Sequence, residues 1–320
     1  MFDASAHILV TGGTGFFGLA LLRHWQSWAH GVPRVTVLSR NPQRFKACYP
    51  ELAALVDWVE GDVLDTATLP WKRAFTHVLH AATDSTHGGR LSPAQRYTQI
   101  VQGTQNALEL AVGTGAARFL LTSSGGVYGA PPVGMGQIPE NYLGMPDPLN
   151  TNNAYSVAKR CAEHLCALCH EQHGLATVIA RCFAFVGPDL PRDVHFSIGN
   201  FLFDALHAPE ITVQGDGTPV RSYMDQRDLA QWISVLLAHG RALEAYNVGS
   251  DQAIAIKDLA FLVRDLLAPE KPVRIVASPA AQSARNWYVP AIDKARGEFG
   301  LQLSYTLPES IVYAAQHGAK

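Results

Sequence analysis

Short apolar runs and longer amphipathic stretches alternate along the first 180 residues of the chain. The apolar runs, which predict strands, occupy residues 7–11, 34–38, 56–59, 77–81, 118–122 and 176–181. Between them lie stretches with apolar residues at helical spacing, one of which opens with Ser92 as N-cap and Pro93 as first helical residue. This alternation predicts βαβ units and an α/β fold with a doubly wound, Rossmann-type parallel sheet.

A glycine-rich turn joins the first strand to the first helix. Its residues are Gly12, Thr14, Gly15, Phe16, Phe17 and Gly18, with the glycines in a GxxGxxG spacing. Gly12 allows a sharp turn, Gly15 lets the backbone approach a pyrophosphate, and Gly18 lets the helix pack close against the sheet. The alternative is an ordinary glycine-rich turn, but the strand before it and the helix after it favour dinucleotide binding at the helix N-terminus.

The second strand ends in Ser39 and Arg40, about 20 residues after the glycine turn, where NAD-binding chains usually have an acid. A hydroxyl and a guanidinium suit a 2′-phosphate, which a carboxylate would repel. We therefore expect NADP(H), with NAD(H) as the alternative if Arg40 simply begins a surface loop.

Further cofactor contacts are expected after the third and fourth strands. Asp62, followed by Val63, suits an adenine amino group, and an ordinary turn aspartate is an equally good interpretation. Ala81 and Ala82 are small where the cofactor would pass, and Thr83 opens a polar loop expected near the substrate.

Chain length, net charge and the N-terminal residues predict the number of domains, the kinds of partner and the compartment. A chain of 320 residues predicts about two domains. A net charge of −2 without long charge runs gives no reason to expect a nucleic acid or an anionic membrane as partner. The N-terminus has neither a basic leader nor a membrane span, which predicts a cytoplasmic protein.

Five cysteines, an odd number, predict free thiols rather than a disulfide framework. Cys161, Cys166 and Cys169 fall on one apolar arc of a helix with Leu168, whereas His164 points to the opposite side. We therefore expect core packing there and no metal site.

Tyr155 and Lys159 lie four residues apart at the start of a predicted helix and so share one face. An ammonium beside a phenol lowers the phenol pKa from about 10 toward neutral pH, which enables proton transfer. A YxxxK spacing is common by chance, but here it accompanies a glycine turn and an upstream serine at a strand end.

Together these motifs resemble the extended short-chain dehydrogenase/reductases that modify nucleotide-linked sugars. The resemblance covers nearly the whole chain, through residues 11–18, 123–129, 155–159, 181–188, 215–223 and 246–249. It implies a cofactor domain of residues 1–187 with 229–250 and a nucleotide-sugar domain of residues 188–228 with 251–320. It also implies a homodimer built from two helices of each subunit.

The resemblance also implies roles for individual residues. Ser124, Tyr155 and Lys159 fall on the catalytic positions, and Arg221 falls on the arginine that grips the diphosphate of the nucleotide sugar. Arg285 matches a second such arginine in a less distinctive stretch. Ala184 and Ile100 depart from the family pattern, since many relatives have Asn at both positions.

The turn after Ser124 narrows the reaction. Relatives that eliminate water from the sugar carry an Asp-Glu pair where this chain has Gly125 and Gly126, so we expect 4-keto reduction or 4-epimerisation instead. Ser39 and Arg40 favour an NADPH-dependent 4-ketoreductase. A regulator that senses NADP(H) on the same fold is the competing class, disfavoured because both Tyr155 and Lys159 are present.

Overall fold

The computed structural model describes residues 2–28, 31, 33–83, 91–192, 196–276 and 287–318. The chain forms two compact units. Unit 1 comprises Met1–Val127, Met145–Cys182 and Ala230–Tyr246, and unit 2 comprises Tyr128–Gly144, Phe183–Leu229 and Asn247–Lys320.

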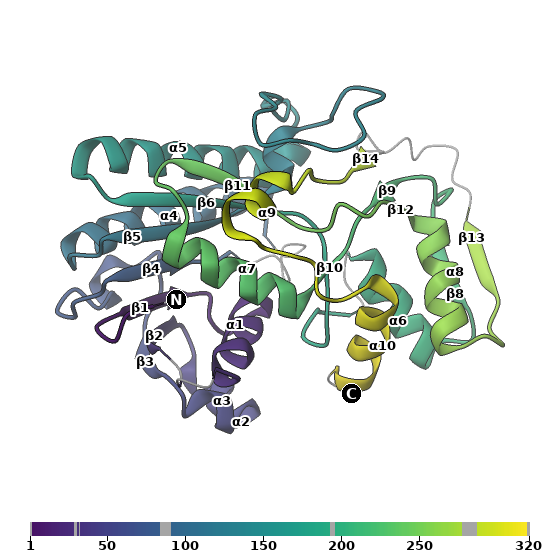
Figure 1. Ribbon diagram of the computed structural model, residues 1–320, viewed down its shortest axis with the longest axis horizontal. Helices are drawn as coiled ribbons and strands as arrows, with labels where there is room; N and C mark the ends of the chain where they lie inside the picture. Colours follow the sequence, from purple (N-terminus) through teal and green to yellow (C-terminus); the bar gives the residue numbers. More distant parts are fainter. Residues whose placement is uncertain are drawn as a thin grey trace. The chain divides into compact units, whose positions relative to one another are not determined.

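Unit 1 is built on a seven-stranded sheet with the order β11-β6-β5-β4-β1-β2-β3 (Figure 1). The strands are β1 (His7–Thr11), β2 (Arg34–Ser39), β3 (Asp57–Glu60), β4 (His77–His80), β5 (Arg118–Ser124), β6 (Ala176–Cys182) and β11 (Glu244–Val248). β1 pairs in parallel with both β2 and β4. The strands after β1 are added first on one side of it, as β2 and β3, and then on the other, as β4, β5 and β6, so the strand order reverses between β1 and β4. The predicted doubly wound parallel sheet is confirmed, and ligands of such sheets bind at the carboxyl ends of the strands beside this reversal.

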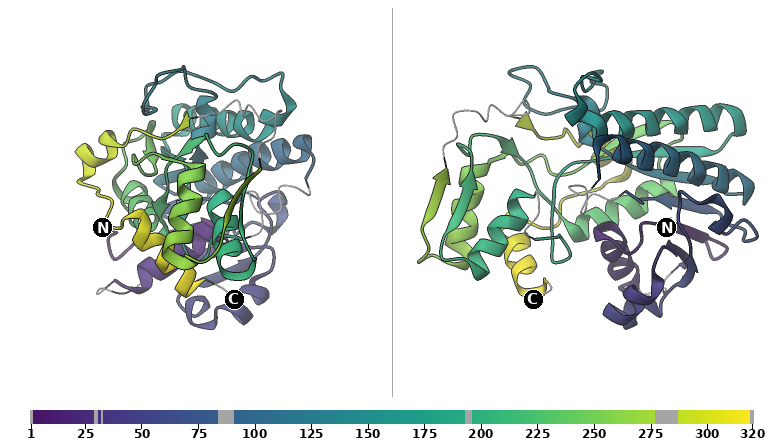
Figure 2. Two further views of the ribbon diagram at one scale, coloured as in Figure 1. Left: turned by 90° about the vertical axis from the view of Figure 1, so that its right-hand side faces the viewer. Right: turned by 180° about the vertical axis from the view of Figure 1, so that it is seen from behind.

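Helices cover both faces of this sheet. They are α1 (Phe16–Gln26), α2 (Pro42–Cys48), α3 (Pro50–Ala53), α4 (Pro93–Gly113), α5 (Ala154–His173) and α7 (Gln226–His239). α4 and α5 lie side by side on one face, and α1 and α7 lie on the other (Figures 1 and 2). Trp25 of α1 is fully buried and donates a 2.9 Å hydrogen bond from its indole nitrogen to Ser234 of α7, which fixes these two helices together.

The two long helices follow their sequence signals closely. Ser92 caps α4, as the Ser92-Pro93 pair predicts, and it also forms a capping box with Gln95. On α5, Cys166 and Cys169 are buried, whereas Cys161 is only partly buried and Leu168 is 38% exposed. The expectation that all of this arc lies in the core is therefore wrong for Cys161 and Leu168. The reason is that the sheet covers only one side of α5.

Unit 2 contains short strands and helices. They are β7 (Phe185–Val186), α6 (Ser197–His207), β8 (Ile211–Gln214), β9 (Val220–Arg221), β10 (Met224–Asp225), β12 (Ile254–Ala255), α8 (Ile256–Leu267), β13 (Val273–Val276), β14 (Trp287–Tyr288), α9 (Asp293–Phe299) and α10 (Leu307–His317). The strands form three small sheets, β10-β7, β12-β9-β14 and β13-β8.

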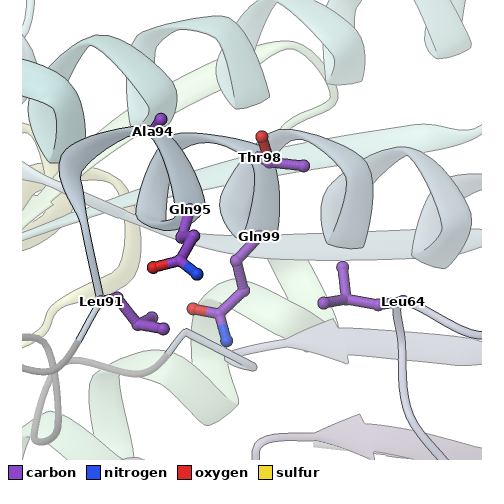
Figure 3. Close-up of a pocket in the computed structure, with 6 residues that line it drawn as sticks. All are labelled: Leu64, Leu91, Ala94, Gln95, Thr98 and Gln99. Atoms are coloured by element: carbon purple, nitrogen blue, oxygen red, sulfur yellow. The ribbon is translucent and has the colours of Figure 1, made fainter.

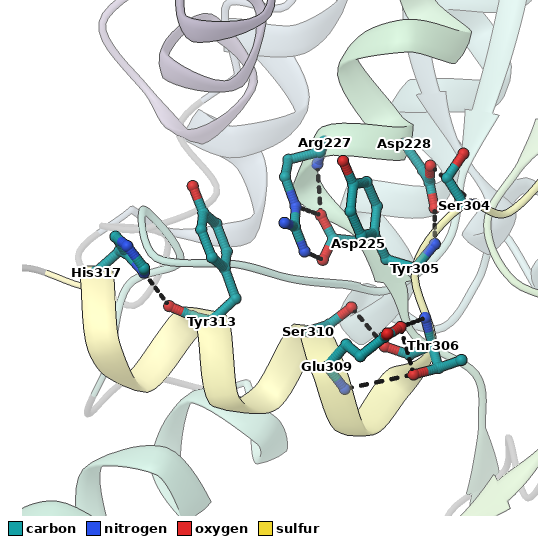
Figure 4. A network of polar contacts seen from close by, with 10 residues as sticks. All are labelled: Asp225, Arg227, Asp228, Ser304, Tyr305, Thr306, Glu309, Ser310, Tyr313 and His317. Carbon is teal, nitrogen blue, oxygen red and sulfur yellow. Dashed lines mark hydrogen bonds and ion pairs between the residues drawn. The ribbon is translucent and has the colours of Figure 1, made fainter.

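Arg227 anchors the C-terminal segment of unit 2 (Figure 4). Its guanidinium lies 3.4 Å from the ring centroid of Tyr305 and 3.9 Å from that of Tyr313, and it donates to both carboxylate oxygens of Asp225. Asp228 accepts the backbone N–H of Tyr305 at 3.3 Å. These contacts hold α10 against the start of α7. Within the described ranges, no helix is both long and apolar enough to cross a membrane.

Candidate active site

Four strands of unit 1 end at one edge of the sheet, because parallel strands place their carboxyl ends together. Their last residues are Thr11, Ser39, His80 and Ser124. The segments that follow these strands, which lie far apart in sequence, therefore meet at this edge. Thr11 and His80 are in direct contact through a 2.8 Å hydrogen bond between their side chains.

The glycine turn is shaped by close backbone contacts. Gly12 has φ of +75°, and a Cβ at this position would come within 2.5 Å of the Ala81 carbonyl group, so the turn lies directly against the end of β4. A Cβ at Gly18 would overlap the backbone of Gly13. The close approach at Gly18 is thus made to the turn itself, whereas the sequence suggested the sheet.

Gly15 leaves room for a ligand. It is exposed, and a Cβ built on it would have its nearest neighbour at 3.6 Å. It is also the N-cap of α1 and supplies no side-chain cap, and the first turn of α1 contains no acidic residue. A pyrophosphate therefore fits where a capping side chain would otherwise lie. Thr14 beside it is exposed, and the rings of Phe16 and Phe17 meet edge to face at 5.9 Å.

The end of β2 combines charges of both signs. Ser39 is buried and its hydroxyl accepts the backbone N–H of Asn41 at 3.3 Å, while Arg40 is exposed. Glu60 is the register partner of Ser39 on β3 and is also exposed. Paired strands lie about 4.8 Å apart, so this carboxylate is close to the predicted 2′-phosphate site. Glu60 could not be predicted from the sequence, because only the strand pairing brings it to Ser39.

The Asp62 segment is held by its own turn. One carboxylate oxygen of Asp62 accepts the backbone N–H of Leu64 at 3.0 Å, and the carbonyl of Val63 accepts the side-chain amide of Asn106 on α4 at 2.7 Å. The turn interpretation of Asp62 therefore has a structural basis, and the second carboxylate oxygen is not used by this turn.

A pocket of about 430 Å³ adjoins this segment (Figure 3). It is lined by Leu64, Leu91, Ala94, Gln95, Thr98 and Gln99. Oε1 of Gln99 is buried and has no hydrogen-bond partner among the residues that the structure describes. Gln99 was not predicted as a site residue, because helical periodicity does not distinguish a pocket-lining glutamine from an exposed one.

Ser124 is the last residue of β5 and is buried. Its hydroxyl oxygen accepts the backbone N–H of Gly126 at 3.1 Å, across the short helical turn η2 (Gly125–Tyr128). A hydroxyl that accepts one hydrogen bond retains its own hydrogen to donate. Ser124 thus keeps a hydrogen-bond donor at the carboxyl end of β5.

Lys159 is buried beneath the same edge. Its ammonium donates to the Thr83 hydroxyl at 2.9 Å and to the Thr122 carbonyl at 2.7 Å, which occupies two of its three N–H donors. Burial lowers the pKa of Lys159 to about 8. Burial, reinforced by the Lys159 charge, lowers the pKa of His80 to about 3, so this imidazole is neutral.

Tyr155 lies one turn before Lys159 on α5 and is half-buried. The Lys159 nitrogen is 5.9 Å from the centroid of the Tyr155 ring. The structure thus places the two side chains of the YxxxK spacing together, on the helix that packs against β5. Proton transfer at neutral pH is the chemistry that such a phenol and ammonium pair supports.

Arg221 belongs to unit 2, where it lies on the central strand of a small sheet. One guanidinium nitrogen donates to the Val220 carbonyl at 2.8 Å, and the guanidinium carbon is 5.8 Å from the ring centroid of Tyr288. Tyr288 is also its register partner on β14. Arg285 lies outside the described residues.

The chain matches a known protein family over most of its length. The model of the NAD dependent epimerase/dehydratase family matches residues 8–249. The chain belongs to this family. The match runs from β1 through β11 and so includes the glycine turn, Ser124, Tyr155 and Lys159.

Individual relatives within the family differ in the reaction that their names describe. The chain is 28% identical over 312 residues to UDP-glucuronic acid decarboxylase 6 of Arabidopsis thaliana, covering 97% of this chain and 88% of the relative. It is 28% identical over 269 residues to dTDP-glucose 4,6-dehydratase of Streptomyces griseus, covering 81% of this chain and 78% of the relative.

A solved structure shares the fold over almost its whole length. It is the dTDP-glucose 4,6-dehydratase DesIV of Streptomyces venezuelae with NAD and TYD bound. The identity is 26%, the match covers 97% of this chain and 96% of that chain, and the TM-score is 0.83.

Proposed function

We propose that this member of the epimerase/dehydratase family is an NADPH-dependent oxidoreductase that reduces a 4-keto group on a nucleotide-diphosphate sugar. A bound nicotinamide supplies the hydride in such a reaction. The residues of the chain are assigned to holding the substrate oxygen and moving the proton. The assignment of unit 1 to the cofactor and of unit 2 to the nucleotide sugar is part of the proposal.

Three residues of unit 1 carry the proton chemistry. The Ser124 hydroxyl donates to the carbonyl oxygen, since its own oxygen already accepts the Gly126 N–H. The Tyr155 phenol donates the proton that the reduced oxygen requires. Lys159 holds the nicotinamide ribose with its remaining N–H donor and favours the anionic form of the phenol by its positive charge.

The observation that carries the choice of reaction is the turn after Ser124. Residues Gly125 and Gly126 have no side chain that transfers a proton, and the next residue, Val127, is a fully buried hydrocarbon. Elimination of water needs an additional acid and base, and this turn provides neither. Oxidation and reduction at C4, which need only Ser124 and Tyr155, remain.

The support for NADPH is electrostatic. Arg40 at the end of β2 is exposed and suits a 2′-phosphate, whereas Glu60 on the neighbouring strand opposes it. NAD(H) is therefore the alternative. The pocket beside Val63 suits the adenine ring, whose amino group would satisfy the buried Oε1 of Gln99.

Two other reactions, which begin with oxidation at C4, fit the same residues. A 4-epimerase removes and returns the hydride and consumes no cofactor. The similarity to UDP-glucuronic acid decarboxylase 6 over 97% of the chain supports testing a uronic acid, since a 4-keto uronic acid is a β-keto acid and loses CO2 readily.

A homodimer through α4 and α5 is also proposed, because Tyr97 and Leu168 on these helices are 37% and 38% exposed.

The test is a panel of nucleotide sugars with purified protein. A 4-keto-6-deoxyhexose nucleotide with NADPH should give stoichiometric loss of NADPH absorbance. Interconversion of UDP-glucose and UDP-galactose without added cofactor would assign an epimerase, and CO2 release from UDP-glucuronic acid would assign a decarboxylase. If no sugar is turned over but cofactor redox state changes the affinity for a partner protein, the chain is a regulator.

A further inference from the structure

A buried ion pair lies in unit 1, one helical turn beyond Lys159 on α5. The Glu163 carboxylate accepts hydrogen bonds from Arg181 Nε at 3.0 Å and from Arg181 Nη2 at 2.7 Å. The Ser123 hydroxyl donates to the same carboxylate at 2.6 Å. The side chains of Arg181 and Glu163 are only 12% and 10% exposed. Solvent therefore screens this pair little, and its bidentate geometry is rigid.

The strand pairing explains how one carboxylate binds both donors. Ser123 on β5 and Arg181 on β6 are register partners. Directly opposed residues of paired strands extend their side chains from the same face of the sheet. This is the face covered by α5, from which Glu163 reaches both residues. The carboxylate thus joins α5 to two adjacent strands at a single point along each.

The residues of this ion pair and its serine partner adjoin the residues of the predicted catalytic site. Ser123 immediately precedes Ser124 on β5, and Glu163 follows Lys159 by one turn of α5. The bond from Lys159 to the Thr122 carbonyl, at 2.7 Å, is a second tie between the same two elements. Two ties at successive turns fix the position of the helix along the strand.

We propose that Glu163 is a positioning residue that fixes α5 along β5 and thereby sets the distance between the catalytic groups on the two elements. The inference rests on the proposed function, in which Ser124 acts together with Tyr155 and Lys159. A misplacement of about 1 Å from a residue outside the chemistry costs on the order of 10²-fold in rate. Removal of the tie should therefore lower kcat more than it raises KM.

Glu163 also acts on the charge of Lys159. Among the described residues, the titratable groups that face Lys159 are Tyr155, Glu163 and Cys166 on α5, His80 on β4 and Cys182 on β6. Burial keeps His80 neutral by lowering its pKa to about 3, and keeps Cys182 neutral by raising its pKa to about 12. Burial likewise raises the pKa of Cys166 well above its usual value. With both thiols neutral, the Glu163 carboxylate is the anion among these groups that opposes the effect of burial on Lys159, and it also pairs with the Arg181 guanidinium.

Two variants and a matched control test this role. Glu163→Gln removes the charge and Ser123→Ala removes one donor with little change of volume. Asp251→Asn is the control, because it breaks a partly buried ion pair with Arg296 (2.6 Å) that lies in unit 2, away from Lys159 in sequence. For each protein we would measure thermal stability, kcat and KM for the nucleotide sugar that the panel identifies as substrate, and NAD(P)H affinity by fluorescence from about pH 6 to about pH 10.

We expect Glu163→Gln to lower kcat by about 10- to 100-fold with KM within about threefold, and Ser123→Ala to act in the same direction but less. Because Glu163 raises the pKa of Lys159, Glu163→Gln should also move the alkaline loss of NAD(P)H affinity to lower pH, whereas Ser123→Ala should not. The control should lose stability while its kcat and pH profile stay unchanged.

The proposal is overturned if Glu163→Gln loses stability as the control does but keeps the wild-type kcat and loses NAD(P)H affinity at the same alkaline pH as the wild type. The cofactor titration separates this outcome from a failure of the proposed function, because it needs no sugar. If the wild-type protein binds NAD(P)H and turns over no sugar, the proposed reaction is wrong. If Glu163→Gln then loses NAD(P)H affinity at a lower pH than the wild type, the role of Glu163 at Lys159 is still supported. If the pH of this loss is unchanged, the proposal is overturned.

Discussion

The ammonium of Lys159 donates a 2.9 Å hydrogen bond to the hydroxyl of Thr83, a residue that lies 76 positions earlier in the chain. This bond ties α5 to the segment after β4, which is the passage predicted for the cofactor. The buried ammonium has a pKa of about 8 in the folded protein against 10.5 as its ordinary value. Burial of the charged Lys159 ammonium therefore lowers the stability of the folded protein.

This cost predicts a specific pH dependence of folding. Between about pH 8 and pH 10.5 the unfolded chain binds more protons at Lys159 than the folded protein does, so stability should rise with pH. The free energy of unfolding of the wild type should increase by about 2–3 kcal/mol between pH 7 and pH 10 relative to Lys159→Met. Urea unfolding of both proteins at the two pH values measures this difference, and a constant difference would contradict the buried charge.

Replacement of the Tyr155 hydroxyl should remove proton transfer alone. Tyr155→Phe keeps the ring packed beside Lys159, and we expect kcat to fall by ~10²–10⁴-fold while the NAD(P)H dissociation constant stays nearly unchanged. Steady-state kinetics and cofactor fluorescence measure the two quantities. Turnover close to the wild-type rate would show that the proton comes from another group.

Two alanine substitutions in the glycine turn should affect different properties, one the stability of the apo protein and the other its cofactor affinity. Gly18→Ala places a Cβ into the Gly13 backbone, and overpacking of this kind costs about 1–3 kcal/mol, so the apo protein should lose thermal stability. Gly15→Ala has 3.6 Å of clearance and should leave apo stability unchanged while it weakens cofactor binding. Thermal unfolding and NAD(P)H titration of both variants test this, and unaltered cofactor affinity in Gly15→Ala would argue against a pyrophosphate there.

Cofactor choice should respond to the two charges at the end of β2. Arg40→Ala should lower the preference for NADPH over NADH by about tenfold or more, the effect of one hydrogen bond to a charged group. Glu60→Gln should raise that preference, because it removes the carboxylate on the neighbouring strand. The ratio of the two kcat/KM values measures the preference. If neither substitution changes the ratio, the 2′-position of the ribose lies elsewhere.

The predicted diphosphate contact of Arg221 can be tested by binding alone. Arg221→Ala should weaken nucleotide-sugar binding by about 1.5–3 kcal/mol, the value of a hydrogen bond to a charged group. Arg274→Ala is the control, since this arginine is 55% exposed and pairs with Glu210 at 2.5 Å. Isothermal titration calorimetry with a nucleotide sugar measures both. Wild-type affinity in Arg221→Ala would remove the assignment.

The sequence by itself determined the sheet, the glycine turn and the shared face of Tyr155 and Lys159. These features depend on local periodicity, on backbone conformations that favour glycine, and on the 3.6-residue repeat of the helix, all of which are encoded within a few residues. The six apolar runs predicted as strands are strands β1 to β6 within two residues at each end. The N-cap of α4 at Ser92, with Pro93 in its first turn, followed from the sequence for the same reason.

Only the tertiary structure decided which distant residues share an environment. Strand pairing brought Glu60 beside Ser39 and Ser123 beside Arg181, and the packing of α5 on one side of the sheet left Leu168 exposed while it buried Lys159. Burial then set the pKa of Lys159 to about 8. A pKa shift or a second charge at a site depends on what surrounds a group in space, and a sequence position alone does not specify its neighbours across the sheet.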